Sequence, residues 1–275
     1  MKLLIMGTAA YERVPAMFCN CGVCEQARKL GNKNIRTQAQ VLIDDTLLVD
    51  FGMDNYYHYM KYDKDYTKIE NLIITHSHND HFLPSELFMT GNVCGHNDME
   101  KLNVFGNEEC LRKFETITHP EKCDFHTVKP YETFKAGKYN ITPIPASHPT
   151  ESPFCYVIDD GEKVLMYNND SGVFADEVYE NIKKIGFKFD TVLADCTCGL
   201  LEVEGVTHMS LMDNEVHRRK LTEIGAIDEN TTWIITHYSH NALFENGVPT
   251  TAERMEEIAR ERGMISAFDG MEIEI

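Results

Sequence analysis

The stretch His76-Ser77-His78-Asn79-Asp80-His81 places four side chains that can bind metal ions within six residues. It directly follows the apolar run Leu72-Ile73-Ile74, which predicts a buried strand that ends where the polar residues begin. Imidazole and carboxylate groups together suit divalent cations such as zinc, manganese or iron. A single histidine is more often a buried core residue, but three histidines and an aspartate this close together would be costly to bury without a cation. The stretch therefore predicts a metal site in the loop after a strand.

Three further candidate ligands stand at the ends of later apolar stretches. His148 follows residues 141–147, Asp170 comes shortly after 164–167, and His237 follows 233–236. Strands hold side chains rigidly, while the loops at their ends leave those side chains accessible. We therefore expect these residues to meet in one cleft at one edge of a sheet.

The whole chain resembles the metallo-β-lactamase-fold hydrolases, whose motif His-x-His-x-Asp-His reads here as His76, His78, Asp80 and His81. The resemblance implies a dinuclear metal site in which Asp170 bridges the two ions. It assigns His76, His78 and His148 to the first ion and Asp80, His81 and His237 to the second. The ions would be zinc or manganese, or else nickel or iron, because the same ligands accept all of these metals.

Two short stretches resemble a narrower branch of this superfamily, the PhnP-like phosphodiesterases that act on phosphoribosyl cyclic phosphate. They are Cys19-Asn20-Cys21-Gly22-Val23-Cys24 and His237-Tyr238-Ser239-His240. The resemblance implies a structural zinc held by Cys19, Cys21, Cys24 and His240. Independently, three cysteines spaced this closely in a turn can direct their thiolates at one point, and a ligand from elsewhere would complete a tetrahedron. A group of ordinary reduced thiols is the alternative.

Composition and charge limit the classes of protein that this chain can represent. Its 275 residues contain no linker-like tract or repeat, which predicts one domain over residues 1–275. Nine cysteines, an odd number, indicate a reducing compartment, and residues 1–7 are too short an apolar run for a signal peptide or a membrane span. We therefore expect a cytoplasmic protein without a membrane partner.

The net charge of -18 opposes binding to long nucleic acids, which depends on many lysine and arginine contacts to phosphate. A small anionic phosphate ester is still an acceptable partner, since bound cations reverse the polarity of a site. A homodimer is common in the PhnP-like branch, although no exposed apolar stripe in this sequence identifies an interface.

Apolar periodicity and turn residues predict strands interspersed with helices. We expect helices at residues 84–90, 108–116, 175–184, 210–223 and 251–262, and strands at 2–6, 40–43, 46–50, 71–75, 102–105, 139–144, 155–158, 164–167, 191–194, 233–236 and 272–275. Asp44-Asp45 and Asp159-Asp160-Gly161 are hairpin signals. Periodicity alone does not separate a two-sheet sandwich from a doubly wound parallel sheet, and the resemblance implies a four-layer αββα sandwich of the α/β (α+β) class.

The resemblance implies hydrolysis of a cyclic or diester phosphate by hydroxide held between the two ions. The catalytic candidates are Asp80, as a metal ligand, and His208, which lies thirteen residues beyond Asp195. An imidazole titrates near neutrality and suits proton delivery to the leaving oxygen. A surface or helix-capping residue is the alternative for His208. Asp50 is expected to support the ligand loop through hydrogen bonds rather than to bind metal.

Other classes share the predicted metal centre. A lactonase or another carbon-centred hydrolase fits the same ligands, and a PqqB-like cofactor-biosynthesis protein also carries a Cys-x-Cys-x-x-Cys stretch. Relatives of the tRNA 3'-end endonucleases need a substrate-gripping arm and basic surface, and this chain shows neither. The other histidines lack a clustered partner and are predicted to lie on the surface: His58, His96, His119, His126 and His217.

Overall fold

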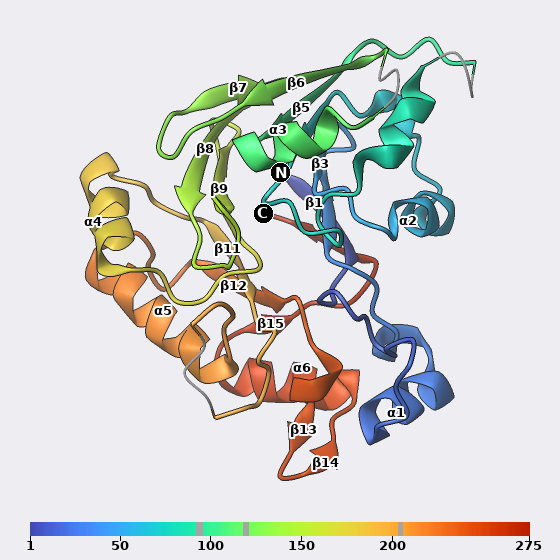
Figure 1. Cartoon of the computed structure of the whole chain (residues 1–275). Coiled ribbons are helices and arrows are strands. Elements are labelled where there is room, and N and C mark those ends of the chain that lie inside the picture. The colour runs from blue at the N-terminus through green and yellow to red at the C-terminus, as the bar shows by residue number, and fades with distance from the viewer. Residues whose placement is uncertain (92–95, 118–120, 203–205) are drawn as a thin grey trace.

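Two seven-stranded sheets pack face to face between layers of helices in this computed structural model, which describes residues 1–91, 96–117, 121–202 and 206–275 (Figure 1). The first sheet has the order β16 (Met271–Glu274), β1 (Lys2–Gly7), β2 (Gln40–Ile43), β3 (Leu47–Val49), β4 (Asn71–Ile73), β5 (Leu102–Gly106) and β6 (Cys123–Thr127). The second has the order β15 (Ile265–Ser266), β12 (Thr232–Thr236), β11 (Thr191–Asp195), β10 (Val164–Asn168), β9 (Phe154–Asp159), β8 (Tyr139–Pro145) and β7 (Phe134–Ala136). The predicted αββα sandwich is confirmed.

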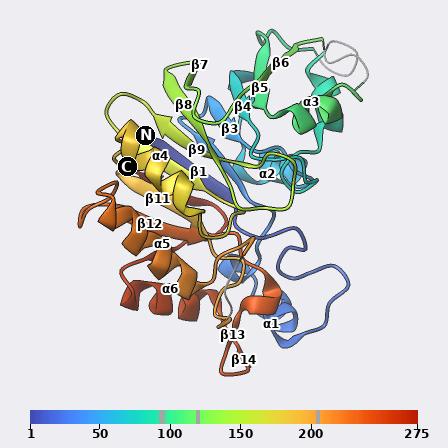
Figure 2. The same cartoon turned by 60° about the vertical axis from the view of Figure 1, so that its left-hand side comes forward.

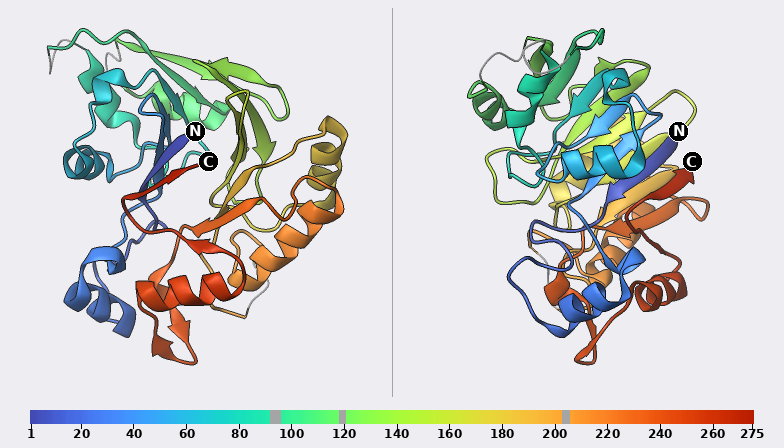
Figure 3. Two further views of the ribbon diagram at one scale, coloured as in Figure 1. Left: turned by 180° about the vertical axis from the view of Figure 1, so that it is seen from behind. Right: turned by 90° about the vertical axis from the view of Figure 1, so that its right-hand side faces the viewer.

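Helices cover the outer face of each sheet (Figures 2 and 3). The first sheet is covered by α2 (Asn55–Tyr62), α3 (Glu108–Phe114) and the 3₁₀ helix η3 (Pro84–Thr90). The second is covered by α1 (Gly22–Leu30), α4 (Asp176–Ile185), α5 (Leu211–Glu223) and α6 (Ala252–Glu261). Smaller elements are the hairpin of β13 (Phe244–Glu245) and β14 (Val248–Pro249) and the 3₁₀ helices η1 (Asn32–Asn34), η2 (Tyr66–Lys68) and η4 (His240–Ala242).

The alternation of side chains along each strand divides the core into three parts. Leu3 and Ile5 of β1 point into the layer between the two sheets, while Leu4 and Met6 point outward to the helices. Because both faces of each sheet are covered, the strands are apolar on both sides. Burial of each such side chain contributes about 1.5–3 kcal/mol. The core therefore fixes the strands whose ends carry the candidate ligands.

All eleven predicted strands and all five predicted helices have a counterpart in the structure, with ends that differ by one or two residues. The two hairpin signals join β2 to β3 and β9 to β10, both antiparallel as expected. Residues 84–90 form a 3₁₀ helix rather than an α-helix. The helices α1 and α2 were not predicted, nor were β6, β7, β13, β14 and β15. In the part of the chain that the structure describes, no helix is long and apolar enough to cross a membrane.

Candidate metal centre

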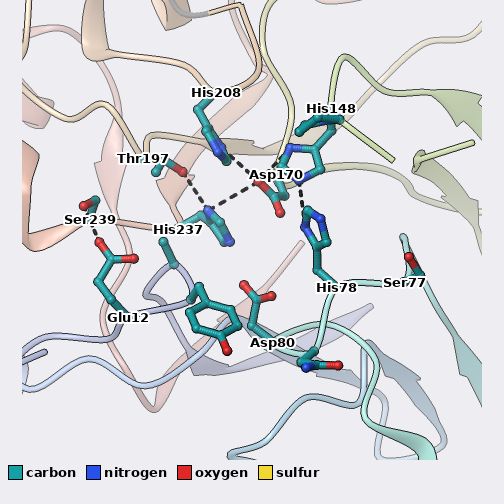
Figure 4. Close-up of a pocket in the computed structure, with 14 residues that line it drawn as sticks. Glu12, Ser77, His78, Asp80, His148, Asp170, Thr197, His208, His237 and Ser239 are labelled. Carbon is teal, nitrogen blue, oxygen red and sulfur yellow. Dashed lines mark hydrogen bonds and ion pairs between the residues drawn. The ribbon is translucent and has the colours of Figure 1, made fainter. Parts of the chain in front are cut away.

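The candidate ligands gather at one edge of the sandwich because of the direction in which the strands run. In the second sheet β10, β11 and β12 are parallel to one another. β8 runs in the same direction as β10, because β8 and β10 are both antiparallel to β9. The chain carries His148 just after β8, Asp170 just after β10, and His237 directly after β12. The loop after β4 of the first sheet brings the stretch 76–81 to the same place (Figure 4).

The first group of ligand atoms surrounds His78. Its Nδ1 lies 3.1 Å from His76 Nε2 and 3.1 Å from His148 Nε2. Asp170 closes the group, with Oδ2 3.1 Å from His76 Nε2 and Oδ1 3.3 Å from His148 Nδ1. One ligand atom from each of these four residues lies within 4.8 Å of all the others. The structure thus brings together the residues predicted to hold the first ion.

The second group surrounds His81 and shares Asp170 with the first. His81 Nε2 lies 3.3 Å from His237 Nε2, 3.4 Å from Asp80 Oδ2 and 3.2 Å from Asp170 Oδ2. These four residues are all buried, and their ligand atoms also lie within 4.8 Å of one another. Asp80 Oδ1 is buried and has no hydrogen-bond partner among the residues that the structure describes. A buried carboxylate oxygen that lacks a partner is costly, and a cation would satisfy it.

The spacing of these atoms fits bound metal ions. Nitrogen and oxygen ligands at about 2.0–2.2 Å from a tetrahedral ion lie roughly 3.3–3.5 Å from each other. The observed separations of 3.1–3.4 Å are close to that value. Two imidazole nitrogens at such a distance can share a proton in a hydrogen bond, or both can donate lone pairs to one cation. The residues present therefore fit a pair of divalent ions that share Asp170.

Burial and mutual charge set the protonation of these groups. Burial, helped by the neighbouring His81, lowers the pKa of His76 to about 3, so its imidazole is neutral and its lone pair is free. Burial would raise the pKa of Asp170, but the surrounding imidazoles, His237 foremost, outweigh it and hold that pKa well below its usual range. Asp170 is therefore a carboxylate, the form that binds metal.

Buried polar contacts hold the ligand loop in place. Asp50 Oδ2 lies 2.8 Å from His81 Nδ1, and its Oδ1 accepts hydrogen bonds from the backbone N–H and hydroxyl of Thr75, each at 2.8 Å. This is the supporting place expected for Asp50. Asp50, Asp170 and His237 have positive φ values of 66°, 55° and 64°. A left-handed backbone conformation in a residue other than glycine costs of order 1 kcal/mol or more, and it often occurs at functional sites.

Asp195, at the end of β11, holds the residues around His208. Its Oδ2 lies 3.3 Å from His208 Nδ1 and 3.3 Å from His237 Nδ1, and accepts the hydroxyl of Thr197 at 2.7 Å. His208 Nδ1 also lies 2.9 Å from Asp170 Oδ1. Burial lowers the pKa of His208, but its hydrogen bonds to Asp170 and Asp195 outweigh burial and raise the pKa to about 10. Asp170, Asp195, His208 and His237 form a further group whose ligand atoms lie within 4.8 Å of one another.

A cleft of about 560 Å³ opens over the two ligand groups (Figure 4). The sequence analysis did not predict several residues that line it, among them Tyr11, Glu12, Thr197 and Ser239. Ser239 lies between two predicted ligands, and Thr197 follows the end of a predicted strand, so both positions carried a signal. No pattern in the sequence marked Tyr11 or Glu12. They reach the cleft because Ala9 forms an isolated bridge with Tyr238.

The cysteine cluster lies beside this cleft, between the start of α1 and η4. His240 Nδ1 lies 3.7 Å from Cys19 Sγ and 3.4 Å from Cys21 Sγ, and Cys24 completes a group within 4.8 Å. Zinc bonds of about 2.3 Å to sulfur and 2.0–2.1 Å to nitrogen place such atoms about 3.5 Å apart. Burial raises the pKa of the Cys24 thiol to about 12. The geometry fits one tetrahedral metal ion.

Two of the histidines predicted to lie on the surface are buried, so those predictions were wrong. His217 accepts a hydrogen bond from Asn168 Nδ2 at 2.9 Å and lies 2.5 Å from Tyr179 Oη. His58 lies 2.7 Å from both Thr37 Oγ1 and Gln40 Oε1. A neutral imidazole with both nitrogens hydrogen-bonded can be buried at little cost. His96 and His126 are exposed as predicted, and His119 lies outside the described residues.

Comparison with known sequences identifies a family. The profile of the β-lactamase superfamily domain matches residues 45–238, which include all the candidate ligands from His76 to His237. Ribonuclease Z of Thermoplasma acidophilum is 29% identical over 135 residues, an alignment that covers 46% of this chain and 43% of that protein. The chain thus aligns with less than half of that ribonuclease.

Comparison with solved structures supports the fold. A diphosphatase from the PhnP family has a TM-score of 0.70 and 20% identity, and the match covers 100% of this chain and 97% of that one. Zinc-bound PqqB from Methylobacterium extorquens has a TM-score of 0.73 and 17% identity, with 100% of both chains covered. At these sequence identities the comparison shows a shared fold and no more.

Proposed function

Because this chain belongs to the β-lactamase superfamily, we propose that it is a metal-dependent hydrolase that cleaves a small cyclic or diester phosphate. Phosphoribosyl cyclic phosphate is the candidate substrate type, from the likeness of its cysteine and histidine stretches to the PhnP-like branch. One observation supports the proposal above all: two groups of buried or partly buried histidine and aspartate side chains share Asp170 at the floor of an open cleft.

The ligand groups support a proposal for the cofactors that this function would need. His76, His78 and His148 would hold one divalent ion, and Asp80, His81 and His237 the other, with Asp170 between them. When bound, two such ions supply an activated water and positive charge for the phosphoryl oxygens. Zinc or manganese is our proposal for this pair, and we further infer one structural zinc at Cys19, Cys21, Cys24 and His240.

The residues around the ions would complete the reaction. Hydrolysis joins a water oxygen to phosphorus, breaks the phosphorus–oxygen bond to the leaving group, and requires a proton at that leaving oxygen. His208 lines the cleft beside Asp170 and is held by Asp195, so it is placed to orient the substrate and to deliver this proton. Asp195 acts through His208 and His237 as a positioning residue, because it contacts both imidazoles.

RNA processing is a second candidate, favoured by the alignment with ribonuclease Z. That activity requires a surface that binds a long polyanion. The lining residues within the described part of the chain include no lysine or arginine. The net charge of -18 also opposes such binding. We therefore favour a small phosphate ester over a folded RNA.

A substrate panel tests the proposed function. Enzyme of measured metal content would be assayed with phosphoribosyl cyclic phosphate, cyclic nucleotides, bis-p-nitrophenyl phosphate, pre-tRNA and lactones. We expect turnover of the cyclic or diester phosphates, and an Asp170→Asn control should abolish it. Hydrolysis of lactones with none of any phosphate ester would overturn the proposal in favour of a carbon-centred hydrolase.

A further inference from the structure

One wall of the cleft carries a carboxylate that belongs to neither ligand group. Glu12 lines the pocket together with Ala10 and Tyr11, in the loop after β1. Figure 4 shows Glu12 beside Ser239, across the pocket from His78 and His148. A substrate whose phosphoryl group lies over the metal ligands would therefore extend the rest of its structure toward this glutamate.

The Glu12 side chain is held in place rather than free to turn away. Ser239 Oγ donates a hydrogen bond to Glu12 Oε1, and His240 Nε2 lies 4.0 Å from the same oxygen. The backbone on either side is also fixed, since Ala10 N donates to Tyr238 O at 3.1 Å and Gln38 Nε2 donates to Tyr11 O at 2.9 Å. The carboxylate is thus a lasting feature of the cleft wall.

Among the described residues that line the cleft there is no lysine or arginine to pair with Glu12. The adjacent Arg13 is paired with Asp54, its Nε at 2.8 Å from Oδ2 and its Nη2 at 3.0 Å from Oδ1. Lys113, near the ligand loop, donates to Ser77 O and to Asn79 Oδ1 at 2.6 and 2.7 Å. Residues 92–95, 118–120 and 203–205, outside the described part of the chain, contain no lysine or arginine.

We propose that Glu12 determines substrate choice, and that it selects phosphate esters whose distal part is uncharged or cationic over those that carry a second phosphate at that end. This inference rests on the proposed function and narrows it: among ribosyl cyclic phosphates, it favours those without a phosphate on the 5-hydroxyl over the phosphoribosyl form. A sugar hydroxyl or an ammonium group can donate a hydrogen bond to the free carboxylate oxygen, and such charge-assisted bonds are strong. A distal phosphate would instead meet a fixed like charge, with no lysine or arginine among the described lining residues to offset it.

Binding measurements test this choice without any need for turnover. Ribose 1-phosphate and ribose 1,5-bisphosphate share the phosphate that the metal ions would bind and differ only at the distal end. With metal-loaded enzyme in a calorimeter, we expect the monophosphate to bind about tenfold more tightly. Glu12→Gln should reduce this preference at least fivefold, and Glu12→Lys should reverse it. Glu229→Gln, which removes an exposed glutamate in another loop, should leave it unchanged.

The outcomes separate this inference from the proposed function. Tighter binding of the bisphosphate by the unaltered enzyme, or an unchanged preference in Glu12→Gln, would overturn the role of Glu12. Metal content measured on each variant shows whether the ligand groups are intact. If none of the cyclic and diester phosphates in the substrate panel is hydrolysed, the proposed function fails, while the binding ratio still decides the role of Glu12.

Discussion

The two candidate metal regions are built in different ways. The histidine and aspartate groups stand at strand ends of both sheets, where the ligands of the second group are all buried. The cysteine cluster joins the loop before α1 to η4, and Cys19 and Cys21 are only partly buried. In the first region the packed core holds the ligands before any ion binds. In the second, an ion would itself hold two loops together. We therefore expect metal at the first region to serve chemistry and metal at the second to serve stability.

The largest expected effect comes from Asp170, which both histidine groups share. Asp170→Asn keeps the size of the side chain but removes the charge that faces the imidazoles around it. We expect kcat/KM to fall by about 10³-fold or more, with loss of both active-site ions and retention of the cysteine-bound ion. Elemental analysis beside kinetics measures both quantities. A variant that keeps two active-site ions would contradict the bridging role.

The opposite pattern is expected for the cysteine cluster. Cys21→Ser should lose one metal ion and about 3 kcal/mol of unfolding free energy, because the two loops are no longer tied together. Urea unfolding measures this loss, and the active-site metal content should not change. Cys198→Ser, which alters a half-buried thiol outside both clusters, is the control. If Cys21→Ser is as stable as the control, the contrast between the two regions is wrong.

Asp50 offers a finer test of the strand-end region. In our proposal Asp50 binds no ion. Its Oδ2 lies 2.8 Å from His81 Nδ1 and so orients that imidazole. Asp50→Asn should weaken metal binding about 10- to 100-fold, because carboxylates that orient a ligating histidine contribute that much. Metal titration followed by activity would measure the shift. Asp45→Asn, at an exposed position, is the matched control. If both variants bind metal with equal affinity, Asp50 does not support the metal site.

The smallest expected effect concerns acid stability. Burial lowers the pKa of His217 to about 3, whereas in the unfolded chain its pKa is about 6.5. As the pH falls below 6.5, His217 is protonated in the unfolded chain but stays neutral in the folded protein. Its contribution to the free energy of unfolding is therefore complete above pH 6.5 and is lost on acidification. The loss reaches about 1.4 kcal/mol by pH 5.5. His217→Gln should show a flatter decline of unfolding free energy with falling pH, and an equally steep decline would show that His217 does not cause it.

The sequence was informative where a residue's role follows from its neighbours along the chain. The stretch from His76 to His81 contains ligands of both groups, and apolar runs of four or five residues marked most strands. The helix α2 was not predicted because its sequence contains no apolar stripe at helical spacing. Its residues Tyr56, Tyr57 and Tyr59 are exposed. The local pattern that predicts a helix is absent there, and tertiary packing supplies the stability instead.

Properties that depend on distant parts of the chain could not be predicted. His217 is buried because Asn168 and Tyr179, from β10 and α4, satisfy its two nitrogens. Glu12 lines the cleft because Ser239, 227 positions away, donates a hydrogen bond to its carboxylate. No sequence window reveals such contacts, since they arise only when the two sheets have packed together.

The separation of the cysteine ligands along the chain also has a consequence for biosynthesis. Cys19 and His240 are 221 positions apart. At a translation rate of about 5–20 residues per second, the three thiols leave the ribosome roughly 10 to 45 s before their histidine partner. Until then the nascent polypeptide lacks His240 of the proposed zinc site and His237, a proposed ligand of the second active-site ion. Its thiols are open to oxidation during this interval, so a reducing environment matters most while the protein is being made.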